Sequence, residues 1–169
     1  RLVRWNRETR AVECFEERHF AAIVLQRRSV PAREEETVPA LLAAVRESGL
    51  QTLPWSDSAI ALRQRVCFLR AQLADAGLPD FSDAALLGSL ETWLAPLLRD
   101  KRRLDAVRAE EISQALADQL DYAQRRLLDA EAPLAIQVPS GMQRRIDYTN
   151  EGAPVLAVKS NELFGLGET

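Results

Sequence analysis

The sequence predicts an α+β fold in which a β segment, a helical region and a second β segment follow one another. Three observations support this: apolar residues alternate near both ends, they recur at helical spacing between them, and turn and cap residues mark the changes. Hydrophobic residues make up 47% and charged residues 28% of the 169, which is typical of a folded domain. The expected regions are residues 1–30, 31–133 and 134–169.

The first thirty residues predict an antiparallel meander. Its strands are expected at Leu2–Trp5, Ala11–Phe15 and Phe20–Gln26, joined by polar turns at Asn6–Thr9 and Glu16–His19. The third segment is almost continuously apolar, which predicts a buried strand.

The central region predicts a bundle of four to five helices. The expected spans are Thr37–Ser48, Ser56–Gly77, Ser82–Leu97 and Ala109–Leu120, and the last of these runs on, or bends, towards Ala130. Acidic residues at 34–36 suit the positive end of the first helix dipole, and Pro96 predicts a kink or break near the end of the third helix. Short connections favour antiparallel packing.

The end of the chain predicts a hairpin, a third strand and a short helix. The segments Leu134–Val138 and Arg144–Tyr148 alternate in polarity and flank a Pro-Ser-Gly turn. A third strand is expected at Pro154–Val158, followed by a short helix that begins at Ser160 or Asn161.

The sequence lacks the motifs that would predict catalysis. It contains no phosphate-binding loop, which requires glycines and a lysine at fixed spacing. Cys14 and Cys67 are expected to be buried free thiols, and His19 a surface or structural residue. A Cys14–His19 dyad stays open, although nothing indicates a third group that would orient it. We therefore expect no catalytic, cofactor or metal site in this chain.

Charge and hydropathy narrow the expected location and partners. The net charge is −3, but residues 1–30 carry seven arginines against four glutamates, a balance of +3. A basic face could therefore exist on an acidic protein, although ordinary solvated charge explains the same numbers. No run approaches the roughly 18 apolar residues of a membrane span, so we expect a cytoplasmic protein without membrane contact.

Two basic clusters are candidates for nucleic-acid contact. Lys101, Arg102 and Arg103 form the densest cluster, in a loop between helices where they could reach phosphates. Arg144 and Arg145 form the second, on a predicted strand. The alternative for the first cluster is an ionic interaction with the end of the preceding helix.

The three tryptophans could in principle stack on bases. Trp93 lies in the apolar stripe of the third helix, which favours core packing. Trp55 precedes a helix cap and is expected to pack on the first turn of that helix. Trp5 lies in the first predicted strand.

Several strings occur in the order found in HrpB-type helicases, and the chain resembles the C-terminal region of that family over most of residues 20–169. The matching strings are Gly49–Asp57, Leu62–Arg70, Asp80–Leu98, Val138–Gly141, Ile146–Tyr148, Pro154–Val158 and Glu162–Leu166. The segment Lys159–Asn161 departs from the family pattern, which puts family-specific contacts there in doubt.

The resemblance implies a bacterial, cytoplasmic DEAH-type helicase of superfamily 2. Its two RecA-like motor domains would bind ATP, Mg²⁺ and RNA, and winged-helix, helical and OB-like modules and a C-terminal extension would follow. Residues 1–30 would be the last strands of the OB-like module and residues 31–169 most of the extension, truncated at both ends. No motor motif matches this chain.

The expected function is that of an accessory C-terminal domain, non-catalytic alone, which contacts single-stranded RNA or regulates the motor domains it packs against. The alternative is a protein-interaction module that recruits a partner to the helicase without binding nucleic acid. Salt-dependent RNA binding would separate the two.

Overall fold

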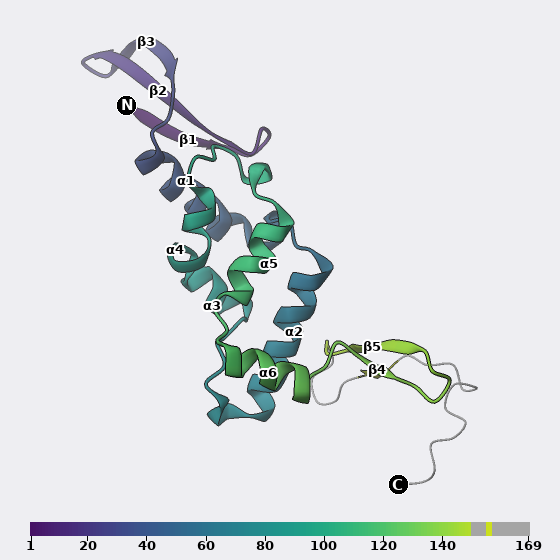
Figure 1. Ribbon diagram of the computed structural model, residues 1–169. Coiled ribbons are helices and arrows are strands. Elements are labelled where there is room, and N and C mark those ends of the chain that lie inside the picture. Colours follow the sequence, from purple (N-terminus) through teal and green to yellow (C-terminus); the bar gives the residue numbers. More distant parts are fainter. Residues whose placement is uncertain (150–154, 157–169) are drawn as a thin grey trace. The chain divides into compact units, whose positions relative to one another are not determined.

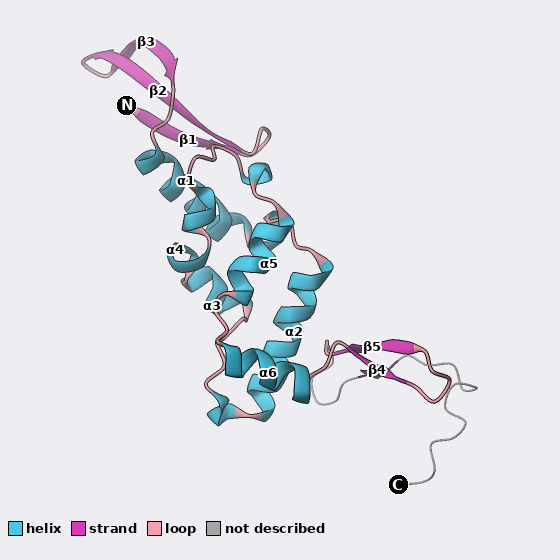
Figure 2. Cartoon of the chain, viewed as in Figure 1, coloured by secondary structure: helices cyan, strands magenta, loops and turns pink. Residues whose placement is uncertain are grey.

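A computed structural model describes residues 1–149 and 155–156, and it confirms the α+β class (Figures 1 and 2). The chain divides into two compact units. The first unit comprises residues 1–59 and 83–116, and the second comprises residues 60–82 and 117–169. Among the described helices, none combines the length and the apolar character that a membrane span requires. The limits expected near residues 30 and 133 stay predictions.

The first unit begins with the predicted three-stranded antiparallel meander. The strands are β1 (Leu2–Asn6), β2 (Ala11–Phe20) and β3 (Ile23–Val30), in the order β1-β2-β3. The polar turn expected at residues 16–19 is wrong, because β2 continues through it and the chain turns at Ala21 and Ala22.

The charged residues of β2 pair across the sheet. Glu16 lies opposite Arg28 and Glu17 opposite Arg27, with the Arg27 NH2 group 2.5 Å from a Glu17 carboxylate oxygen. Opposite charges on directly facing positions favour a strand pair. Glu16 and Glu17 therefore continue the strand, although their polarity predicted that the strand would end before them.

The expectation of a buried third strand is also wrong. Phe20 is 71% exposed, Ile23 64% and Leu25 66%, while Val12 and Cys14 of β2 are buried. We call the part of the sheet at Ala11–Cys14 the inner end, and the part at Arg18–Gln26 the outer end. Helix α1 (Glu34–Ser48) contacts β1 and β2, and an irregularity in the register separates the outer end at Arg18 and His19.

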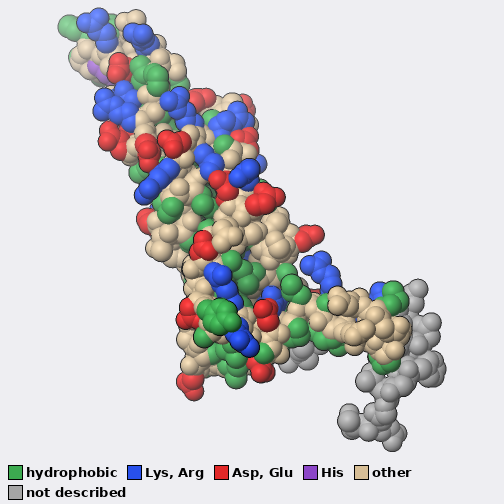
Figure 3. Space-filling view, in the orientation of Figure 1, with side chains coloured by type: hydrophobic (Ala, Val, Ile, Leu, Met, Phe, Trp, Pro, Cys, Tyr) green, Lys and Arg blue, Asp and Glu red, His purple; other side chains and the backbone are tan. Residues whose placement is uncertain are grey.

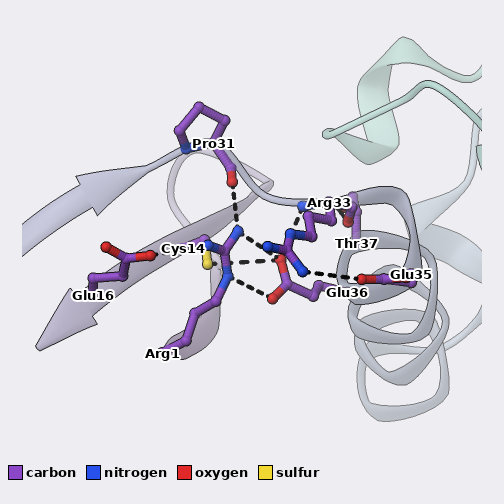
Figure 4. A network of polar contacts seen from close by, with 8 residues as sticks. All are labelled: Arg1, Cys14, Glu16, Pro31, Arg33, Glu35, Glu36 and Thr37. Carbon is purple, nitrogen blue, oxygen red and sulfur yellow. Dashed lines mark hydrogen bonds and ion pairs between the residues drawn. The ribbon is translucent and has the colours of Figure 1, made fainter.

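One carboxylate ties the inner end to the start of α1 (Figure 4). Glu36 accepts hydrogen bonds from Arg1 Nε at 2.6 Å and from the Arg33 backbone N–H at 2.9 Å, and it lies 3.9 Å from the Cys14 sulfur. The Arg1 hydrogen bond, followed by that from Arg33, lowers the pKa of Glu36. The bond from Arg33 also satisfies one of the backbone donors that a helix start leaves without an intrahelical partner.

Short helices complete the first unit. They are 3₁₀ helix η1 (Leu50–Thr52), α3 (Asp83–Gly88), α4 (Leu90–Trp93), 3₁₀ helices η3 (Ala95–Leu98) and η4 (Leu104–Ala106), and α5 (Ala109–Ala117). The single helix predicted from Ser82 is therefore wrong, because it is interrupted between α3 and α4, whereas the change from α4 to η3 at Ala95 confirms the break expected near Pro96. Near its middle, the Leu86 carbonyl accepts the Trp93 indole N–H at 3.0 Å, and the Ser89 hydroxyl donates to the Ala85 carbonyl at 2.8 Å.

Trp93 belongs to the core, as expected. This side chain is 3% exposed, and its ring centroid lies 6.4 Å from that of Trp55. The Trp55 indole donates to the Leu50 carbonyl at 2.7 Å, so Trp55 contacts η1 as well as Trp93, and its packing on the first turn of the following helix stays a prediction.

The second unit contains most of α2 (Asp57–Gln72) together with 3₁₀ helix η2 (Ala74–Ala76) and α6 (Tyr122–Glu131). The fourth predicted helix ends before α6 because Asp121 caps a new one: its side chain accepts from the Gln124 backbone N–H at 2.8 Å.

A buried cation joins the two long helices of the second unit. Arg65 of α2 is 6% exposed, and its Nε donates to the Ala132 carbonyl at 2.5 Å. Its NH2 group lies 2.8 Å from the Asp129 carboxylate on α6. Because an unpaired buried charge would be costly, these contacts fix how α2 and α6 meet.

A hairpin follows, as predicted. Strands β4 (Ala135–Gln137) and β5 (Gln143–Asp147) pair antiparallel, with a positive φ of 83° at Gly141 in the turn, and β6 (Val155–Leu156) pairs with β5. The short helix expected from residue 160 lies outside the described residues.

Candidate nucleic-acid interface

Lys101, the first residue of the densest basic cluster, is partly buried and paired with groups of the protein. Its ammonium group donates to the Leu97 carbonyl at 2.6 Å and to the Glu111 carboxylate at 2.9 Å, and its side chain is 20% exposed. The Arg108 backbone N–H and then the Lys101 side chain hold the pKa of Glu111 below its usual value. Lys101 therefore ties the loop to the end of η3 and to α5, which is the helix-end interaction considered as the alternative.

Arg103 is also engaged, although it lies at the surface. Its guanidinium makes a two-pronged contact with Asp105, at 2.9 Å from Nε and 2.7 Å from NH2. Hydrogen bonding from Arg103 is the largest cause of the lowered pKa of Asp105. A phosphate at this position would have to compete with a carboxylate that is already matched in geometry.

Arg102 differs from both neighbours. Its side chain is exposed, and it makes no ion pair or hydrogen bond with the residues that the structure describes. Its backbone carbonyl accepts the Val12 N–H at 3.0 Å, and the Leu104 N–H donates to the Arg10 carbonyl at 3.2 Å. These bonds form a β-bridge between Ala11 and Arg103. The loop thus lies against β2 at the inner end, before the pairing with β3 starts at Cys14.

Arg144 and Arg145 lie in β5 of the second unit. Arg144 is opposite Ile136 and its NH2 group is 3.9 Å from the Met142 sulfur, whereas Arg145 is opposite Ala135 and exposed. Adjacent residues of a strand point to opposite faces. These two arginines therefore do not form one patch, and they belong to a different unit from the loop.

The structure brings other basic residues to the loop. The β-bridge places Arg10 beside it, and Arg7 belongs to the same β1–β2 turn. Sequence reasoning missed this grouping because some 90 residues separate the two segments along the chain. The excess of arginine in residues 1–30 was the one signal that pointed to it.

The thiols and the histidine give no sign of catalysis. Cys14 contacts Glu36, whereas His19 is 3.1 Å from the Glu17 carboxylate, so the two residues of the candidate dyad have separate sets of contacts. Cys67 is a free, partly exposed thiol, and burial raises its pKa. Within residues 1–149, His, Cys, Asp and Glu do not gather in a group of three that could hold a metal ion.

The glycines and lysines of this chain do not form a phosphate-binding loop. The glycines at 49, 77 and 141 each have a positive φ at the end of a helix or in the hairpin turn, and none precedes a lysine in a phosphate loop.

Comparison with known proteins defines the class. Residues 93–169 match the family model described as "ATP-dependent helicase C-terminal", which is of the HrpB type. The chain is 36% identical over 132 residues to the ATP-dependent RNA helicase HrpB of Escherichia coli K12. That stretch is 78% of this chain and 16% of the relative.

Solved structures agree. The crystal structure of the E. coli DExH-box NTPase HrpB matches with a TM-score of 0.75 and 30% identity, over 96% of this chain and 20% of that one. A crystal structure of the E. coli DEAH/RHA helicase HrpB matches with a TM-score of 0.73 and 30% identity, over 96% and 21%. The class is therefore the C-terminal part of an ATP-dependent helicase. The chain belongs to the HrpB family and spans about a fifth of the length of these relatives.

Proposed function

We propose that this chain is an accessory domain of a bacterial ATP-dependent RNA helicase that contacts single-stranded RNA beside the motor domains and does not itself hydrolyse ATP. ATP and Mg²⁺ would bind to motor domains outside this chain. The observation that carries the RNA contact is Arg102, an exposed cation on a loop held by backbone hydrogen bonds. The name of the E. coli relative as an RNA helicase supports RNA as the nucleic acid.

The charge environment makes Arg102 the main contact among the five candidate residues. Lys101 and Arg103 neutralise Glu111 and Asp105, so their charges are already balanced within the protein. Since phosphate contact depends on an available positive charge, Arg102 is expected to contribute more than either neighbour. Arg145, exposed on the second unit, is the other candidate.

The test is the salt dependence of binding between the chain and a fluorescently labelled twelve-nucleotide uridine RNA. Arg102→Glu is expected to weaken binding severalfold and to flatten the dependence on log salt by about 0.7, because one phosphate fewer is neutralised. Arg103→Glu, which makes the same change of charge, is the matched control and should change binding less. Absence of binding by the wild-type chain at low salt would contradict the proposal.

A second measurement concerns catalysis. The purified chain is expected to release no phosphate from ATP, with or without RNA. Turnover that copurifies with the chain through a second chromatography step would overturn its accessory role.

The outer end of the sheet favours a second candidate function, which is recruitment of a protein partner. Phe20, Ile23 and Leu25 are exposed there, and Figure 3 shows hydrophobic atoms beside basic side chains on that hairpin. Exposed apolar clusters often mark protein contacts. If, in the full-length helicase, Phe20→Ser with Leu25→Ser abolishes binding of a protein partner while Arg102→Glu leaves RNA binding unchanged, recruitment is the better account.

A further inference from the structure

A pocket opens in the first unit beside the loop that carries Lys101, Arg102 and Arg103, which we call the basic loop. It has a volume of about 360 Å³ and lies where the β1–β2 turn faces the end of α1 and the start of η4. Its lining includes Trp5, Arg7, Arg10, Glu47, Thr52 and Leu104. The volume lies in the range of small-molecule sites and is sufficient for one nucleobase.

The walls of this pocket combine a ring with fixed polar groups. Trp5 is partly exposed, so part of its indole is accessible. The Arg10 guanidinium donates to the Thr52 carbonyl, and the Arg7 guanidinium pairs with the Glu47 carboxylate. A base presents a π face together with donors and acceptors on its edge, so it can use the ring and both kinds of polar group.

The carboxylate argues against a simple anion as the ligand. Glu47 would repel phosphate or sulfate placed inside the pocket, whereas its oxygens can accept an N–H from a base edge. A phosphate is better placed outside, on an unpaired cation. Arg102 offers that cation two residues before Leu104 of the pocket wall, and the bond from the Leu104 N–H to the Arg10 carbonyl holds loop and wall together.

We propose that this pocket accepts one base of a single-stranded RNA against Trp5, while Arg102 contacts the adjoining phosphate. The inference rests on the proposed RNA contact and names the residues that would read the strand. Because an aromatic ring stacks on any base, the pocket would grip RNA with little preference for sequence.

Tryptophan emission of the wild-type chain, titrated with the twelve-nucleotide uridine RNA at low salt, tests the pocket directly. Stacking on Trp5 should quench the emission, and Trp5→Phe should remove the quenching while keeping affinity within about twofold, since phenylalanine still stacks. Trp5→Ala should weaken binding by about tenfold, the usual scale for removing one stacked base. Urea unfolding of each variant confirms that the fold is retained.

The control is Arg28→Gln, which removes an exposed cation from β3 of the same sheet. It should weaken binding less than Trp5→Ala does. Three results would each overturn the proposal that the pocket binds a base. They are an equal loss of affinity in Arg28→Gln and Trp5→Ala, an unchanged affinity of Trp5→Ala, and quenching that persists in Trp5→Phe. If RNA binding stays sensitive to Arg102→Glu in those cases, the proposed function survives without the pocket; if the wild-type chain binds no RNA, both fail.

Discussion

The inner and outer ends of the N-terminal sheet are built from similar apolar residues, yet one is buried and the other is exposed. Val12 and Cys14 are 7% and 2% exposed at the inner end, against 71% for Phe20 at the outer end. The inner end contacts α1 and the basic loop through side chains and backbone, whereas the outer end continues as a two-stranded ribbon. The difference shows that burial of a strand depends on which elements reach it.

The largest expected effect comes from truncating the inner end. Val12→Ala removes two buried methyl groups and should lower the free energy of unfolding by about 2 kcal/mol, from reduced burial and the cavity left behind. Urea unfolding followed by tryptophan emission measures it, because all three tryptophans lie in the first unit. If Val12→Ala lowered the free energy of unfolding no more than Leu25→Ala does at the outer end, the two ends would not differ in the stability that their side chains contribute.

A smaller effect on the free energy of unfolding, which depends on pH, is expected when Glu36 is substituted. Hydrogen bonding from Arg1 holds its pKa below the ordinary value of 4.5, so its stabilisation is present above that pH and is lost as the pH falls through the lowered pKa. Glu36→Gln should therefore unfold at lower urea than wild type at pH 7, and the difference should shrink on acidification to about pH 3. A difference that stayed constant with pH would exclude the carboxylate as its cause.

Between the two ends, Arg27→Ala should have a modest effect. Its guanidinium carbon lies 5.6 Å from the centroid of the Phe15 ring, and such contacts contribute about 0.5–1 kcal/mol at exposed sites. Arg27→Lys is the control, because it keeps the charge beside Glu17 and removes the planar group. If Arg27→Ala and wild type were equally stable, the contact between Arg27 and Phe15 would contribute nothing to stability. Phe15 would then behave like the exposed residues of the outer end.

The smallest effect on stability is expected at the outer end itself. Phe20→Ser with Leu25→Ser should change the free energy of unfolding by less than about 0.5 kcal/mol for each substitution, as for other exposed positions. The same variant should bind less of the hydrophobic dye ANS. A large decrease in stability would mean that these side chains are packed in solution.

Local patterns predicted much of this fold. The order of elements, the hairpin and the cap of α2 follow from residues near one another: of Ser56 and Asp57, the two residues expected as that cap, Ser56 accepts the Ala59 backbone N–H at 3.1 Å. The extended β2 was not predicted, because it depends on partners elsewhere in the sequence, and the interruption of the third helix near Ser89 was not predicted either. Glu16 and Glu17 become strand residues only when Arg28 and Arg27 face them.

For the candidate interface, too, local sequence patterns could not predict features that depend on contacts made by folding. Sequence density selected Lys101, Arg102 and Arg103 together, and charge alone could not rank them. Their ranking depends on Glu111 and Asp105, which neutralise two of the three charges, and on the bridge to Ala11 that only folding creates. Arg144 and Arg145 were likewise grouped by their closeness in sequence, although adjacent residues of a strand point to opposite faces.

The bridge at Ala11 has an evolutionary consequence. Backbone atoms of Arg102 and Leu104 make its bonds, so the shape of the loop places little demand on the side chain at position 102. The fold therefore leaves selection at this position to act on function alone, and the same tolerance would let an experimenter attach a spin label or crosslinker there without moving the chain around it.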